Sequence, residues 1–96
     1  MAEDNLDQIR SLSRLAGMAR FCEHQFFDRG RTQDAARIHR QLWNLTRQLE
    51  TMIVSQEQQS VSERYSLNGY QHYKKYFSGS ARPCENLSES LRGEGY

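Results

Sequence analysis

Hydrophobic residues recur every three or four positions between residues 32 and 54, and polar residues fill the positions between them. These apolar residues fall within one stripe on the surface of a helix: Ala35, Ile38, Leu42, Leu45, Leu49 and Met52. Neither glycine nor proline interrupts the stretch. The pattern predicts an amphipathic helix that packs against at least one other helix.

A second apolar stripe predicts a helix from about residue 6 to residue 28. Asn5 is expected to cap its beginning. Gly17 costs about 1 kcal/mol relative to alanine in a helix, and with the small residues around it would allow another helix to approach closely. The residues of this stripe are Ile9, Leu12, Leu15, Ala16, Ala19, Cys22 and Phe26.

The two predicted helices are separated by a short turn. Gly30 can adopt the left-handed conformation that ends a helix, Thr32 can cap the next helix, and Asp34 places a negative charge in its first turn. Because the connection is short, we expect the two helices to be antiparallel neighbours in a helical hairpin.

The chain after Val54 allows two interpretations. The next six residues are polar, but Gln and Glu favour helices, and Val61 and Tyr65 extend an apolar line from Val54 by steps of seven and four. We therefore expect the second helix to continue to about Leu67, with a soluble linker as the alternative. The Asn-Gly pair that follows, residues 68 and 69, is expected to end the helix.

Aromatic residues at helical spacing predict a short third helix after this stop: Tyr70, Tyr73, Tyr76 and Phe77. Residues 78–83 then have the composition of a linker, and Pro83 can begin a last short helix from Cys84 to Arg92. The predicted fold is all-α, with a coiled-coil-like hairpin of two long helices, the short third helix packed across it and a loose C-terminal tail. Residues 1–78 are predicted to form a single helical domain and residues 79–96 a flexible tail.

Composition narrows the class of protein. Hydrophobic residues make up 36% of the 96 residues and the mean hydropathy is −0.91, so the core is small, and a homodimer would complete a four-helix bundle. The net charge of +1 singles out neither nucleic acid nor membrane as a partner. The first residues do not have the pattern of a secretory signal and no run of about 18 apolar residues occurs, so we expect the protein to be neither secreted by the standard route nor membrane-spanning. Two cysteines allow a disulfide, but we expect Cys22 and Cys84 to be reduced and the protein to be cytoplasmic.

Two features are candidates for function. Residues 64–82 combine basic and aromatic side chains, which suits single-stranded nucleic acid, although packing of the aromatics onto the hairpin is the favoured interpretation. Trp43 lies on the second helix away from its main stripe. It is either a contact for a partner or is covered by the tyrosines of the third helix.

No residue pattern indicates catalysis. His24, His39 and His72 are isolated, and no metal-ligand or nucleophile-and-base spacing occurs, so we expect no enzyme activity, metal or cofactor. The predicted function is a small protein–protein interaction module that regulates, inhibits or adapts a larger partner. A nucleic-acid-binding regulator using residues 64–82 and a structural coiled-coil subunit are the alternatives. The predicted partner contacts are Trp43, Val54, Val61, Tyr65, Tyr70, Tyr73, Lys74, Lys75, Tyr76 and Phe77.

Overall fold

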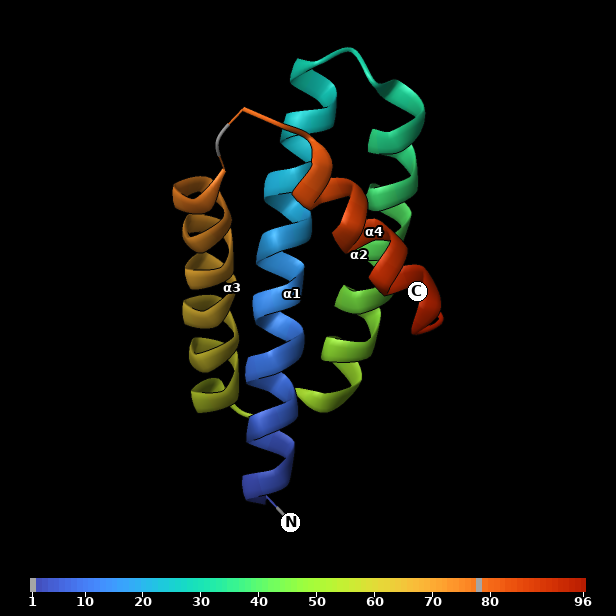
Figure 1. Cartoon of the computed structure of the whole chain (residues 1–96). Helices are drawn as coiled ribbons and strands as arrows, with labels where there is room; N and C mark the ends of the chain where they lie inside the picture. The colour runs from blue at the N-terminus through green and yellow to red at the C-terminus, as the bar shows by residue number, and fades with distance from the viewer. Residues whose placement is uncertain (1, 78) are drawn as a thin grey trace.

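The computed structural model describes residues 2–77 and 79–96, which form helices and turns and contain no strand (Figure 1). The all-α prediction is therefore confirmed. No helix in these residues combines the length and hydrophobicity needed to cross a membrane. The helices are α1 (Ala2–Asp28), α2 (Thr32–Met52), α3 (Gln56–Tyr76) and α4 (Arg82–Gly93).

The first three helices form a layer with α1 in the middle (Figure 1). α2 packs on one side of α1 and runs in the opposite direction. α3 packs on the other side and runs parallel to α1, since Ser13 contacts Ser62 and Gly17 contacts Ser66. In the described residues α2 and α3 do not contact each other. α4 crosses one face of the layer over α1 and α2, whereas the connection from α2 to α3 passes over the opposite face.

The turn between α1 and α2 follows the sequence signals only in part. Gly30 has a φ of 71°, and the Arg31 amide donates to the Phe26 carbonyl at 2.8 Å, which closes α1 as expected. Thr32, however, is the first residue of α2 and does not cap it, because Arg31 occupies the cap position. Asn5 lies inside α1, where its amide donates to the Met52 carbonyl at the end of α2.

The prediction that α2 continues to Leu67 is wrong. α2 stops at Met52, and Ser55 caps a new helix, since its hydroxyl oxygen accepts a hydrogen bond from the Gln58 amide at 3.2 Å. The Gln58 side chain in turn accepts from the Val54 amide at 2.8 Å. This Ser-x-x-Gln pair is a capping signal for a helix start.

Gly69 lies in the interior of α3, so the predicted helix stop at residues 68 and 69 is also wrong. A Cβ atom at Gly69 would overlap the carbonyl of Arg14, and one at Gly17 would overlap the carbonyl of Ser66. The two glycines therefore let the backbones of α1 and α3 meet directly, which supports the close approach expected at Gly17. The short helix predicted from Tyr70 is the last third of α3.

α4 corrects one prediction and agrees with another. A disulfide joins Cys84 of α4 to Cys22 of α1, with the Cα atoms 5.2 Å apart, so the expectation of two reduced cysteines is wrong. Leu87 and Leu91 lie in the common core, as one side of the predicted last helix. Ser78, at the predicted domain boundary, lies outside the described residues.

The end of the chain is not the loose tail that its composition predicts. The Tyr96 hydroxyl donates to the Gln48 side chain, and the Asn44 amide donates to the Tyr96 carbonyl at 3.4 Å. α4 has an apolar stripe, and burial of this stripe stabilises the helix. The stripe packs on the face of the layer formed by α1 and α2. The prediction of a loose tail rested on the glycine and serine residues of the connection. These residues belong to the linker before α4 and not to α4 itself.

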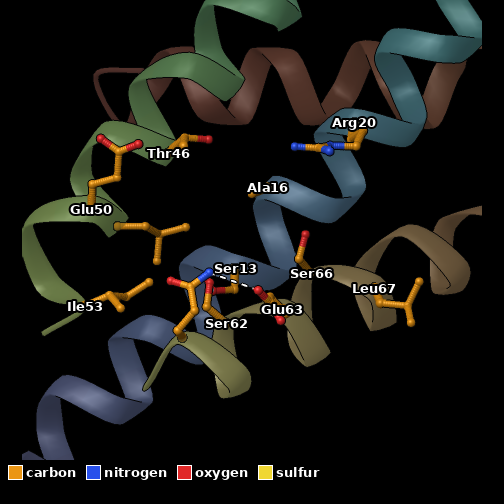
Figure 2. Close-up of a pocket in the computed structure, with 12 residues that line it drawn as sticks. Ser13, Ala16, Arg20, Thr46, Glu50, Ile53, Ser62, Glu63, Ser66 and Leu67 are labelled. Carbon is orange, nitrogen blue, oxygen red and sulfur yellow. Dashed lines mark hydrogen bonds between the residues drawn. The ribbon is translucent and has the colours of Figure 1, made fainter. Parts of the chain in front are cut away.

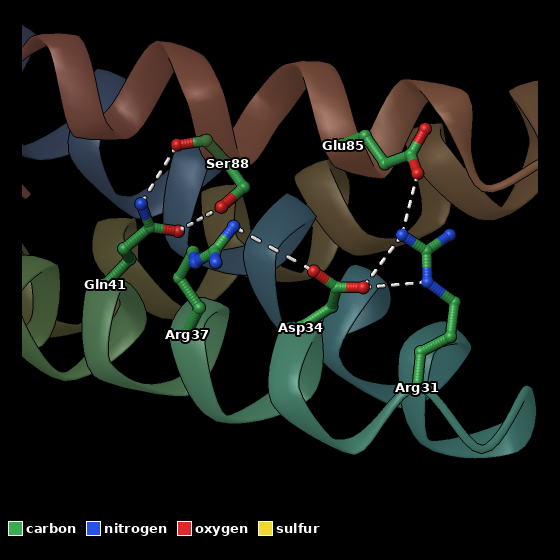
Figure 3. A network of polar contacts seen from close by, with 6 residues as sticks. All are labelled: Arg31, Asp34, Arg37, Gln41, Glu85 and Ser88. Carbon is green, nitrogen blue, oxygen red and sulfur yellow. Dashed lines mark hydrogen bonds and ion pairs between the residues drawn. The ribbon is translucent and has the colours of Figure 1, made fainter.

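Polar contacts fix the position of α4 along α2 (Figure 3). Gln41 and Ser88 are buried and exchange two hydrogen bonds, of 2.8 and 2.9 Å. At the start of α4, Arg31 bridges Asp34 and Glu85, each at 2.7 Å. The hydrogen bonds to Glu85 and Asp34 raise the pKa of the Arg31 guanidinium. The reciprocal pair is buried and satisfied, so it defines a single register for α4.

Candidate interaction surface

An open groove runs between α2 and α3 on the face of the layer away from α4. Its volume is about 500 Å³, and no residue of α4 lines it. The groove exists because α2 and α3 each bury their apolar side against α1 and leave the space between them unfilled. Figure 2 shows α2 on one side of the groove, α3 on the other and α1 between them. α2 contributes Thr46 and Glu50, with Ile53 just after its end, and α3 contributes Ser66 and Leu67. α1 contributes Ser13, Ala16 and Arg20.

The groove mixes apolar and charged groups. Leu49 and Ile53 from α2 and its C-terminal end give it apolar contacts, and Ala16 contributes a small side chain to its floor. Glu50 and Glu63 stand on opposite walls, and Arg20 lies on the floor. Such a surface suits an amphipathic ligand better than a purely apolar one.

Large apolar side chains are exposed on the same side of the layer. Leu67 lines the groove and is 57% exposed. Phe27 follows Arg20 by seven residues on α1, and Trp43 precedes Glu50 by seven residues on α2. Seven residues are close to two helical turns, so Phe27 and Trp43 point to the groove side of their helices. They are 62% and 58% exposed.

The structure separates the predicted contact residues into two groups. The exposed group is Trp43, Val54, Lys74, Lys75 and Tyr76, and the half-buried group is Val61, Tyr65, Tyr70, Tyr73 and Phe77. They do not form one surface, because α2 and α3 lie on opposite sides of α1. Trp43 is consequently not covered by the tyrosines of α3, and that alternative is wrong.

The aromatic residues of α3 pack mainly around Phe21 of α1. The Phe21 ring lies edge-on to the rings of Tyr70, Tyr73 and Phe77, with centroids 5.5, 6.5 and 5.2 Å away. Burial, with a smaller contribution from the neighbouring Tyr76, raises the pKa of the Tyr73 hydroxyl. For these three residues the favoured interpretation, packing onto α1 and not binding of bases, agrees with the structure.

Sequence reasoning missed the groove itself. Phe27 and Leu67 were not selected, although each is a large apolar residue outside the packing stripe of its helix. Arg20, Glu50 and Glu63 had the appearance of ordinary solvated charges. These residues come to line one groove only because α2 and α3 pack on opposite sides of α1 and leave the space between them open.

Two of the three histidines have polar partners on a neighbouring helix. His39 Nδ1 contacts a Glu23 carboxylate oxygen at 2.5 Å, and His24 Nδ1 lies 3.1 Å from the Tyr70 hydroxyl. In the described part of the chain, no three His, Cys, Asp or Glu side chains are grouped so that they could hold a metal ion.

Comparison of the chain with protein-family models, curated proteins and solved structures found no match.

Proposed function

We propose that the protein is a small non-enzymatic interaction module that regulates, inhibits or adapts a larger protein by binding an amphipathic helix of that partner in the groove between α2 and α3. The observation that carries the proposal is the open groove, which is lined by the exposed Leu67, with Phe27 and Trp43 exposed about two helical turns from the lining residues Arg20 and Glu50. Exposed apolar side chains gathered around a groove are typical of protein-binding surfaces. Helix-in-groove recognition is a common mode of such binding.

The geometry suits a helix in particular. α1 forms a floor with α2 on one side and α3 on the other, and a helix laid over it would contact both. This addition would complete a second layer on the face opposite α4, as in a helical bundle. Ala16 on the floor allows the helix to approach closely, while Leu49, Ile53 and Leu67 supply the apolar contacts.

The charges specify the partner's chemistry. Because Glu50 and Glu63 stand on opposite walls, the bound helix is expected to carry Lys or Arg on both edges of its apolar stripe. Arg20 on the floor favours an acidic side chain on the helix where it passes over this position. Such complementarity fixes the register and the choice of partner more than the affinity.

Selection of displayed helical peptides against the purified protein tests the proposal. Trp43 is the single tryptophan and is 58% exposed, so its fluorescence emission should shift to the blue when a selected peptide covers it. Leu67→Asp should weaken peptide binding at least tenfold. Tyr76→Ala removes a large side chain that is 71% exposed and lies outside the groove, so it should leave the affinity unchanged.

Two outcomes would contradict the proposal. One is peptides that bind Leu67→Asp as tightly as the wild type, with circular dichroism showing both proteins equally helical. The other is a protein that light scattering shows to be a dimer at low micromolar concentration and that Leu67→Asp makes monomeric. In that case a second copy of the chain occupies the groove, and the protein is a homodimeric structural subunit.

A further inference from the structure

A second surface, outside the groove, gathers basic side chains from α1 and α3. It is a shallow hollow lined by polar residues alone: Arg14, Asn68, Gln71, His72, Lys74 and Lys75. Arg14 comes from α1 and reaches this place because α1 and α3 touch at Gly69. The hollow contains no carboxylate, although the whole chain is nearly neutral.

The positive charge of this hollow is not neutralised within the described residues. Arg10, Arg31 and Arg37 pair with carboxylates elsewhere, but no described ion pair involves Arg14, Lys74 or Lys75. Residues 64–82 include no Asp or Glu. The sequence had indicated this basic segment of α3, and the tertiary structure adds Arg14 to it.

An aromatic platform adjoins the hollow. His72 lines the hollow and stacks on Tyr76, with ring centroids 6.2 Å apart and an angle of 14° between the rings. Tyr76 is 71% exposed, whereas Tyr70, Tyr73 and Phe77 are half-buried against Phe21. An exposed ring beside lysines is a surface on which a nucleic-acid base can stack.

We propose that this face of α1 and α3 binds single-stranded nucleic acid, with phosphates at Arg14, Lys74 and Lys75 and a base stacked on Tyr76. From Asn68 to Tyr76 the helix extends about 12 Å at 1.5 Å per residue, enough for a short run of nucleotides. The amides of Asn68 and Gln71 supply hydrogen bonds to sugar, phosphate or base edges. The stacked ring pair favours bases over an acidic peptide or a lipid headgroup, since neither of those requires an aromatic face.

Fluorescence anisotropy with a labelled 12-nucleotide single-stranded DNA of mixed sequence tests this inference. With three phosphate contacts, a plot of the logarithm of the affinity against the logarithm of the salt concentration should have a slope of about −2. The affinity should therefore fall roughly 20-fold between 50 and 200 mM salt. Lys74→Glu/Lys75→Glu should abolish measurable binding at 50 mM salt, Arg14→Ala should reduce the slope by about 0.7, and Tyr76→Ala should weaken binding about tenfold.

The matched control is Arg40→Glu/Arg47→Glu, which makes the same charge change on exposed positions of α2. If this control weakens DNA binding as much as Lys74→Glu/Lys75→Glu does, the DNA responds to the overall charge of the protein and the assigned surface is wrong. Binding of anionic phospholipid vesicles or of a duplex as tightly as the single strand, with no effect of Tyr76→Ala, would also overturn the inference. Leu67→Ala removes the apolar side chain from the groove without adding a charge beside the hollow, so it should weaken peptide binding and leave DNA binding unchanged. Failure at one surface can thus be told from failure at the other.

Discussion

Gly17 of α1 and Ser66 of α3 are in direct backbone contact, and a Cβ atom on residue 17 would overlap the Ser66 carbonyl. Alanine normally stabilises a helix by about 1 kcal/mol over glycine. Here Gly17→Ala should instead lower the free energy of unfolding by roughly 2 kcal/mol, because overlap with backbone cannot be relieved by rotating a side chain. Urea denaturation followed by circular dichroism measures the change.

Gly93→Ala is the control for this prediction. A Cβ atom at Gly93 meets open space, so the variant should be as stable as the wild type or slightly more stable. Gly69→Ala should resemble Gly17→Ala, since it overlaps the Arg14 carbonyl. A stabilised Gly17→Ala variant would show that α1 and α3 do not approach this closely in solution.

The disulfide between Cys22 and Cys84 closes a loop with a sequence separation of 62 residues. Constraint of the unfolded chain by a loop of this size stabilises a fold by about 4 kcal/mol. Reduction should therefore lower the urea midpoint strongly and expose α4 to proteolysis near residues 79–81. Cys22→Ala/Cys84→Ala should have the low urea midpoint both with and without reductant. If the wild type has the same urea midpoint under both conditions, the disulfide is not formed.

The buried pair of Gln41 and Ser88 should behave as a coupled unit. Gln41→Leu leaves the buried Ser88 hydroxyl without its acceptor and removes a side-chain donor from the Ser88 carbonyl, which costs about 1–3 kcal/mol. Ser88→Ala in the same chain removes the hydroxyl that has lost its partner. The double variant should therefore lose less free energy of unfolding than the two single variants lose when their losses are added. A double-mutant cycle from urea denaturation measures this coupling, and strictly additive effects would be evidence against the register of α4.

Alkaline pH should destabilise the fold through Tyr73. Burial raises the pKa of its hydroxyl above the unfolded value of 10.0, so the folded state holds this proton more tightly. The resulting stability is fully present below pH 10 and is lost as pH rises through the folded-state pKa. Unfolding measured between pH 8 and pH 11 should show this decline. Tyr73→Phe should reduce the decline, and an identical pH dependence of variant and wild type would contradict it.

Local signals in the sequence determined several parts of this protein. The periodic stripe from Ala35 to Met52 specified the amphipathic helix, because its residues lie on one face whatever surrounds them. Gly30 specified the end of α1, because its positive φ is a backbone preference. Leu87 and Leu91, four residues apart on one side of a helix, likewise indicated α4. The basic–aromatic character of residues 64–82 was also evident in the sequence.

Only the tertiary structure decided how these helices combine. Gly69 has the appearance of a helix stop, but the contact with Arg14 on α1 makes it an interior residue that must be small. Cys22 meets Cys84 only because α4 folds back over α1, a contact across 62 residues that no local pattern encodes. The groove and the basic hollow arise in the same way, since each joins side chains from separate helices whose spacing depends on packing.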